Sequence, residues 1–70
     1  MTEHISNTVY TLRNQKGLTQ EDLAEKIGIT RQTVISIEKG NYTPSILLAL
    51  KIAGLFKMPV EKIFKISYEK

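Results

Sequence analysis

Apolar residues recur at helical spacing along this chain, and glycines or prolines interrupt the pattern at short intervals. Near the start, Val9 and Leu12 lie one helical turn apart, and Gly17 supplies a stop signal. The pattern predicts a first helix over residues 7–16, with Asn7 as its N-cap.

The stretch from Thr19 to Lys39 predicts two short helices joined by a tight turn. Thr19 offers its hydroxyl to the first of them, and Asp22, three residues later, completes a capping box. Gly28 ends that helix, because glycine adopts a left-handed backbone with the least strain. Thr30 then caps the next helix, which runs to about Lys39. Two short helices joined this closely are typical of a helix-turn-helix.

A loop at residues 41–44 precedes Ser45, which caps a fourth helix over Ile46–Phe56. Only Lys51 and Gly54 interrupt the apolar residues of this helix. Because a helix that is apolar on all sides is normally buried, we expect the other elements to surround it on most sides.

The end of the chain predicts one more helix and a strand. Pro59 restarts the chain into a short fifth helix over Val60–Phe64, and residues 64–68 alternate apolar and polar side chains as a strand does. The predicted fold is therefore all-α, a five-helix bundle extended by a small terminal β-sheet. A chain of 70 residues is expected to form one domain, residues 1–70.

Composition narrows the ways in which so small a core can be stabilised. The chain has no cysteine, which excludes disulfides and thiolate metal sites, so we expect stabilisation by pairing as a homodimer. No apolar run approaches the roughly 20 residues of a membrane span. The first residues also lack the features of a secretion signal, so we expect a cytoplasmic protein with no membrane partner.

Ten Lys and Arg stand against seven Asp and Glu, and the net charge of +3 favours a polyanionic partner without requiring one. Catalysis is not expected, because the single histidine, His4, lies close to a terminus and the acidic residues are spread along the chain. Glycine-rich phosphate loops and metal-ligand spacings are also missing. We expect no cofactor, no metal and no small-molecule ligand.

The third predicted helix has one apolar and one polar side. A rotation of about 100° per residue places Val34 and Ile37 on one side, and Gln32, Ser36 and Lys39 on the other. Taken alone, such a polar side is typical of any solvated surface helix. Its first turn favours DNA binding, because this end carries outward N–H groups and enters the major groove in helix-turn-helix proteins.

Arg31 and Gln32 lie in that first turn and are the first candidates for base contacts. Arginine reads guanine, and glutamine reads adenine, through paired hydrogen bonds. Ser36, one turn further along, can reach a third base edge. The methyl groups of Thr33 or Ile35 can contact a thymine methyl.

Phosphate contacts are expected around the same motif. Gln20, at a helix N-terminus, is placed to bind a phosphate and to brace the third helix from behind. The other candidates carry hydroxyl, amide or ammonium donors: Thr19, Thr30, Lys39, Asn41, Tyr42 and Thr43. For Asn41, ordinary turn chemistry is the alternative.

These residues resemble those of the Cro/C1-type helix-turn-helix family, also called the Xre family. The matching segments are Leu12-Arg13, the run from Lys16 to Ala24, Gly28, the run from Thr30 to Val34, the run from Ile37 to Gly40, and Pro44-Ser45. The chain is most similar to the short dimeric repressors of the family, including the cytolysin-operon regulator type. The resemblance implies a lambda-repressor-like DNA-binding domain over residues 9–64, its motif at 20–39, and a dimerisation tail at 65–70.

The resemblance also implies roles for single residues. Gln20 matches a phosphate-binding glutamine, and positions 31, 32 and 36 match base-reading positions of phage repressors. Arg13 and Glu38 fall where relatives place a salt bridge between the first and third helices, and phosphate binding is the alternative for Arg13.

Two departures from the family pattern limit what the resemblance implies. Arg31 and Ser36 stand where phage repressors often have glutamine, so no operator sequence can be transferred. Leu47 stands where relatives usually have a polar residue, and it is either part of an exposed packing patch or one surplus leucine.

In the short dimeric relatives, strands extend the bundle. The resemblance places His4, Ile5 and Ser6 beside Lys65–Tyr68, and a frayed tail is the alternative. It implies a dimer surface of Val60, Ile63, Phe64, Ile66 and Tyr68.

Together these features predict a homodimeric, sequence-specific regulator of transcription that binds double-stranded DNA as a repressor. Two recognition helices related by a two-fold axis would enter major grooves about 34 Å apart, so the operator should be an inverted repeat. The alternative is an antitoxin-like protein-interaction module that uses the same bundle.

Overall fold

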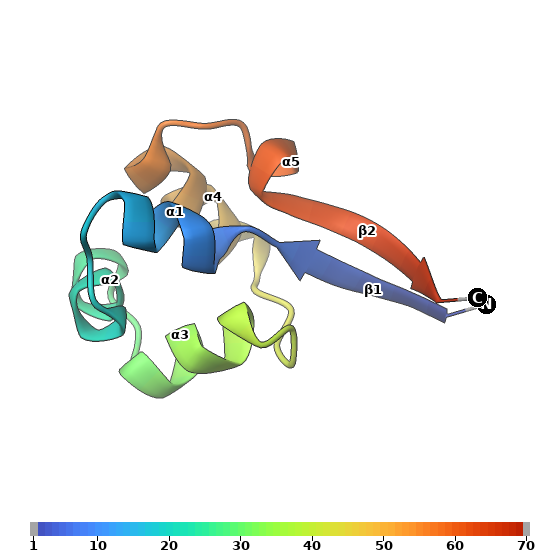
Figure 1. Cartoon of the computed structure of the whole chain (residues 1–70), viewed down its shortest axis with the longest axis horizontal. Helices are drawn as coiled ribbons and strands as arrows, with labels where there is room; N and C mark the ends of the chain where they lie inside the picture. The colour runs from blue at the N-terminus through green and yellow to red at the C-terminus, as the bar shows by residue number, and fades with distance from the viewer. Residues whose placement is uncertain (1, 70) are drawn as a thin grey trace.

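The computed structural model of this protein describes residues 2–69, which form five helices and two strands (Figure 1). The helices are α1 (Val9–Gln15), α2 (Gln20–Ile27), α3 (Arg31–Glu38), α4 (Ile46–Phe56) and α5 (Val60–Ile63), and the strands are β1 (Thr2–Asn7) and β2 (Phe64–Glu69). The helices form a bundle, and the two strands project from it side by side. The predicted five-helix bundle with a small terminal sheet is confirmed.

Side-chain caps fix the starts of three helices. Thr19 Oγ1 accepts a hydrogen bond from the Asp22 N–H, and Asp22 Oδ2 accepts one from the Thr19 N–H, both at 2.9 Å. The bonds from Thr19 lower the pKa of Asp22. Thr30 and Ser45 each accept a bond from the N–H three residues along, at 3.2 and 3.1 Å. All three predicted caps are confirmed.

The start of α1 differs from the prediction. Asn7 is the last residue of β1, and the helix begins only at Val9. The Asn7 side chain still supports this start, because its Oδ1 accepts a bond from the Val9 N–H at 3.0 Å. Its Nδ2 donates to the Ile37 carbonyl at 2.9 Å, so one side chain joins the sheet to both α1 and α3.

The turn between α2 and α3 follows the prediction closely. Gly28 adopts a left-handed φ of 76°, and its N–H donates to the Ala24 carbonyl at 2.9 Å. The third and fifth helices are each one residue shorter than predicted, because Lys39 is the C-cap of α3 and Phe64 begins β2.

The core lies between the helices, and every helix contributes to it. Its buried apolar side chains are Val9, Leu23, Ala24, Ile27, Val34, Ile37, Leu48, Ile52, Ala53, Phe56 and Ile63. The partly buried apolar side chains that pack against this cluster are Leu12, Ile29, Leu55, Met58, Val60 and Phe64. The bundle therefore positions α3 through the buried side chains of its inner face.

The prediction that other elements surround α4 on most sides is wrong. Leu48 and Ile52 face the core, whereas Ile46, Leu47 and Leu50 are 80%, 66% and 55% exposed. An apolar pattern without gaps does not distinguish the buried face of a helix from an exposed apolar face. No helix within residues 2–69 is both long and apolar enough to cross a bilayer.

The strands pair antiparallel over six residues each, with Ile5 opposite Ile66 and Glu3 opposite Tyr68. Side chains alternate between the two faces of a sheet, so Glu3, Ile5, Ile66 and Tyr68 share one face. The other face carries polar side chains: His4, Ser6, Lys65 and Ser67. The expected pairing of the two terminal segments is present, and it is longer than expected.

Candidate nucleic-acid interface

α3 lies along one edge of the bundle, and none of the other labelled elements lies on its outer side in Figure 1. Val34 and Ile37 are each only 1% exposed and anchor the helix to the core. Arg31 and Gln32 are exposed, and Ser36 is half-buried. The polar side of α3 is therefore accessible from its first turn onward.

The first turn of α3 has both satisfied and available donors. Thr30 Oγ1 accepts a bond from the Thr33 N–H, and the two threonine hydroxyls lie 2.9 Å apart. The hydroxyls of Thr30 and Thr33 and the Thr33 N–H therefore take part in the helix cap. The N–H groups of Arg31 and Gln32 have no partner among the described residues, as the geometry of a helix start requires, and they can meet an anion.

A buried ion pair fixes the far end of α3. Arg13 Nε and Nη2 donate to the carboxylate of Glu38 at 2.7 and 3.2 Å, and Arg13 Nη1 donates to the Leu18 carbonyl at 2.8 Å. The side chains of Arg13 and Glu38 are 8% and 6% exposed, and their hydrogen bond raises the pKa of Arg13. The ion pair expected between the first and third helices is present, and its burial gives Arg13 a structural role.

Gln20 joins the same cluster. Its Nε2 donates to Glu38 Oε1 at 3.2 Å, which places the first residue of α2 beside the last residue of α3. The brace that the sequence predicts for Gln20 is therefore present.

The surroundings of Gln20 are less favourable to phosphate than its position suggests. Glu21 and Asp22 are exposed in the same helical turn, so two carboxylates would repel a phosphate there. Thr19 already accepts a bond through its Oγ1 within the capping box, and its hydroxyl proton remains as a donor.

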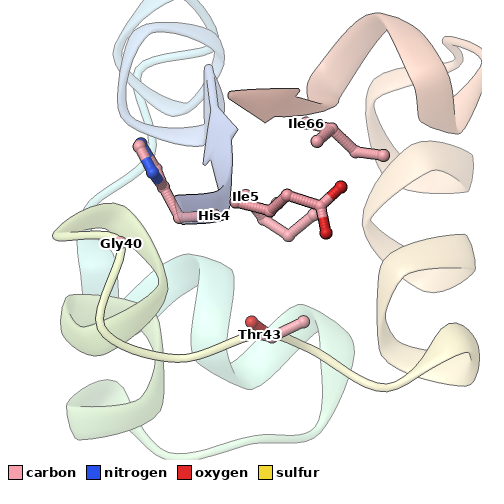
Figure 2. Close-up of a pocket in the computed structure, with 6 residues that line it drawn as sticks. His4, Ile5, Gly40, Thr43 and Ile66 are labelled. Carbon is pink, nitrogen blue, oxygen red and sulfur yellow. The ribbon is translucent and has the colours of Figure 1, made fainter. Parts of the chain in front are cut away.

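The loop after α3 does not form one patch. Tyr42 lines a hollow between the α2–α3 turn and α4, together with Ile29 and Leu47. Thr43 lines a different hollow beneath the sheet, together with Ile66 (Figure 2). The structure therefore separates two residues that we predicted as neighbouring phosphate contacts.

Lys39 and Asn41 flank the end of α3. Both are exposed, and the Asn41 N–H donates to the Ser36 carbonyl at 2.9 Å. That bond closes the last turn, so the backbone of Asn41 has the turn role that we gave as its alternative. Its side chain and that of Lys39 are accessible to a phosphate.

Not all of the residues predicted for the dimer surface are accessible at the surface of the protein. Ile63 cannot belong to it, because its side chain is 0% exposed within one protomer. Val60 and Phe64 are partly buried against the same core. Of the five residues predicted for the dimer surface, only Ile66 and Tyr68 are more than half exposed, at 58% and 56%.

Sequence reasoning missed two exposed apolar residues of α4, Ile46 and Leu50. The only signal for them was the excess of apolar residues in this helix, which we interpreted as burial. Within residues 2–69, no group of three or more His, Cys, Asp or Glu side chains is placed to hold a metal ion.

Comparison with known proteins gives the same class as the geometry. Residues 9–63 match the family described as Helix-turn-helix (HTH_3). The uncharacterized HTH-type transcriptional regulator YgzD of Bacillus subtilis (strain 168) is 51% identical over 65 residues, which cover 93% of this chain and 98% of that protein. The cryptic phage CTXphi transcriptional repressor RstR of Vibrio cholerae is 29% identical over 58 residues, covering 83% of this chain and 52% of RstR.

A solved structure agrees in both sequence and fold. The restriction-modification controller protein C.AhdI from Aeromonas hydrophila superposes with a TM-score of 0.70 at 33% identity, over 77% of this chain and 82% of that one. The fold and the outward α3 thus define a helix-turn-helix protein. The chain belongs to the Cro/C1-type helix-turn-helix family of transcriptional regulators, which act on DNA and are not enzymes.

Proposed function

We propose that this protein is a homodimeric repressor that binds an inverted repeat in double-stranded DNA. The observation that carries this proposal is that α3 is anchored on its inner side and exposed at its first turn. Val34, Ile37 and the buried Glu38 hold the inner side and the far end of the helix, while Arg31 and Gln32 stay exposed at its first turn. A rigid helix with free polar side chains at its amino end suits reading of the major groove.

The proposed contacts divide by chemistry. Arg31 and Gln32 read base edges through paired hydrogen bonds, and Ser36 reaches a third base from the next turn. Thr33 and Ile35 offer methyl groups to thymine. Phosphates are held at the flanks by the helix-start N–H groups and by exposed donors such as Lys39.

Selection of bound duplexes from a random pool tests this function. The enriched sequences should contain two inverted half-sites whose centres lie about one helical turn, roughly 34 Å, apart. Enrichment of a single asymmetric site would contradict the two-fold arrangement. No enrichment at all would favour the protein-interaction module, because such a module has no reason to discriminate between duplexes.

Repression is the simplest mode of action for such a dimer, since bound protein can block access of polymerase to an overlapping promoter. The name of RstR as a transcriptional repressor supports this mode. Deletion of the protein should raise transcription from a promoter that carries the selected site. A fall in transcription would identify an activator instead.

Lys39→Ala should weaken binding to the selected operator and to random duplex by the same factor. The ammonium group would neutralise one phosphate and would read no base, so the dependence of log K on log salt should become shallower by about one. Lys62→Ala, on α5 at the opposite side of the bundle from α3, is the matched control and should leave the slope unchanged (Figure 1). A loss confined to the operator would instead make Lys39 a base-reading residue.

A further inference from the structure

A polar hollow lies where the end of α3 meets β1. The strand contributes His4 and Ser6 to its lining, and the end of α3 and the following turn contribute Lys39 and Gly40. We propose that the DNA-binding surface continues through this hollow onto the sheet, where His4 and Lys65 bind phosphates of the duplex backbone. This inference rests on the DNA binding proposed above and extends it from α3 to the two strands.

The polar face of the sheet consists of His4, Ser6, Lys65 and Ser67. His4 pairs with Ser67, and Ser6 pairs with Lys65, so the four side chains point to the same side of the strands. The Ser67 hydroxyl donates to the Ser6 hydroxyl at 3.0 Å, as this arrangement requires. In Figure 2, His4 points away from Ile66, which belongs to the opposite face. His4 and Lys65 are both exposed and accessible to a ligand.

The polar face adjoins the end of α3. His4 and Ser6 line the same hollow as Lys39, which is the C-cap of that helix. The Asn7 side chain fixes this arrangement, because its Nδ2 donates to the Ile37 carbonyl of α3 at 2.9 Å. The polar face is therefore continuous with the end of α3 and is held against it.

The length of α3 indicates which part of the duplex this face would meet. Its eight residues extend about 12 Å along the helix axis, which is about the width of the major groove. When the amino end of α3 contacts the bases, its far end lies near the edge of the groove, where the phosphates are. Groups beyond Lys39 are therefore expected to face the sugar–phosphate backbone and not the base edges.

The chemistry of the polar face suits phosphates. Lys39 and Lys65 carry ammonium groups, and His4 carries a ring N–H that can donate. None of these three side chains has a hydrogen-bond or ion-pair partner among the groups that the structure describes. The two serine hydroxyls of the face use their protons within the sheet. Glu38 also lines the hollow, but Arg13 neutralises its carboxylate.

The polar face stays available if two copies pair through the opposite face of the sheet. That face carries Ile66 and Tyr68, the accessible residues predicted for the dimer surface, and the acidic Glu3. Because alternate side chains of a strand point to opposite sides, pairing through Ile66 and Tyr68 leaves His4 and Lys65 uncovered. The same alternation directs the Glu3 carboxylate away from the proposed phosphates.

Lys65→Gln in the full chain tests the proposal, because it removes one charge from the polar face and keeps a polar side chain. Binding to the selected operator and to random duplex should weaken by the same factor, up to about tenfold in about 0.1 M salt. The dependence of log K on log salt should become shallower by about one. Lys62→Gln, on α5, is the matched control. It removes the same charge away from the polar face and should change neither quantity.

Ethylation of single phosphates locates the contact. In each half-site, ethylation of a phosphate beside the base pairs read by α3 should impair binding of the wild type and leave Lys65→Gln indifferent. His4→Ala, on the other strand, should weaken binding to both duplexes about fivefold, the effect of one lost hydrogen bond. His4→Gln keeps an N–H donor and should restore most of this loss. Circular dichroism checks that each variant folds, and the His4 pair decides the matter if Lys65→Gln does not fold.

The outcomes distinguish this inference from the proposed function. An unchanged salt dependence in Lys65→Gln, while an inverted repeat is still selected, would overturn the phosphate contact of the sheet alone. Equal effects of Lys65→Gln and Lys62→Gln would also overturn it, because net charge and not position would then matter. A shallower salt dependence of Lys65→Gln on random duplex, in a protein that selects no sequence, would overturn only the sequence-specific function.

Discussion

Replacing Arg13 with methionine should lower the free energy of unfolding by about 3 to 5 kcal/mol, because the change leaves a buried carboxylate without its cation. Glu38 is 6% exposed on its side chain and would keep only the bond from Gln20. Urea denaturation followed by circular dichroism, at one fixed protein concentration, measures the loss.

The double variant with methionine at both Arg13 and Glu38 is the informative control. Replacing a buried ion pair by apolar residues of similar volume is often neutral or stabilising, so the double variant should recover most of the lost stability. Lys16→Met changes an exposed cation just after α1 and should stay within about 0.5 kcal/mol of the wild type. A loss of less than about 1 kcal/mol from Arg13→Met would mean that the pair is not the connection between α1 and α3 that we infer.

Arg31→Ala should cost about 1 to 3 kcal/mol of binding free energy at one base pair of the operator. The side chain is exposed at the first turn of α3, so its removal should leave the unfolding free energy nearly unchanged. Titration of the variant against operators substituted at each position would show the loss at a single position and indifference to substitution there.

Arg31→Lys separates charge from hydrogen-bond geometry. Lysine keeps the positive charge but lacks the planar pair of donors that matches the edge of guanine. This variant should therefore lose discrimination at the same base pair while it retains affinity for random duplex and the salt dependence of the wild type. Equal losses on operator and random DNA from both variants would remove Arg31 from the base-reading residues.

The two predictions test the two ends of α3. Arg13, Glu38 and Gln20 join α1, α2 and the end of α3 in one hydrogen-bonded cluster. Arg31 lies at the other end of α3, where the helix meets solvent. Loss of the cluster should impair binding through the stability of the fold, whereas loss of Arg31 should impair recognition alone.

The sequence was sufficient for features that depend on a few neighbouring residues. The capping box of Thr19 and Asp22, the caps at Thr30 and Ser45, and the left-handed turn at Gly28 all formed where we predicted them. Each is a hydrogen bond or a backbone preference that acts within a few positions, so the local order of residues determines it. The inner side of α3 was predictable for the same reason, since its two buried residues follow the period of a helix.

Tertiary structure decided the features that depend on which elements pack together. α4 is apolar on nearly all sides, so its sequence does not indicate which of its residues are buried in the bundle. The packing of the other helices determines that Ile46 and Leu50 are exposed. Packing likewise buries Ile63 completely and turns Tyr42 and Thr43 toward different hollows. Burial depends on contacts between segments that are far apart in the chain. The periodicity of one segment contains no information about which distant segments pack against it.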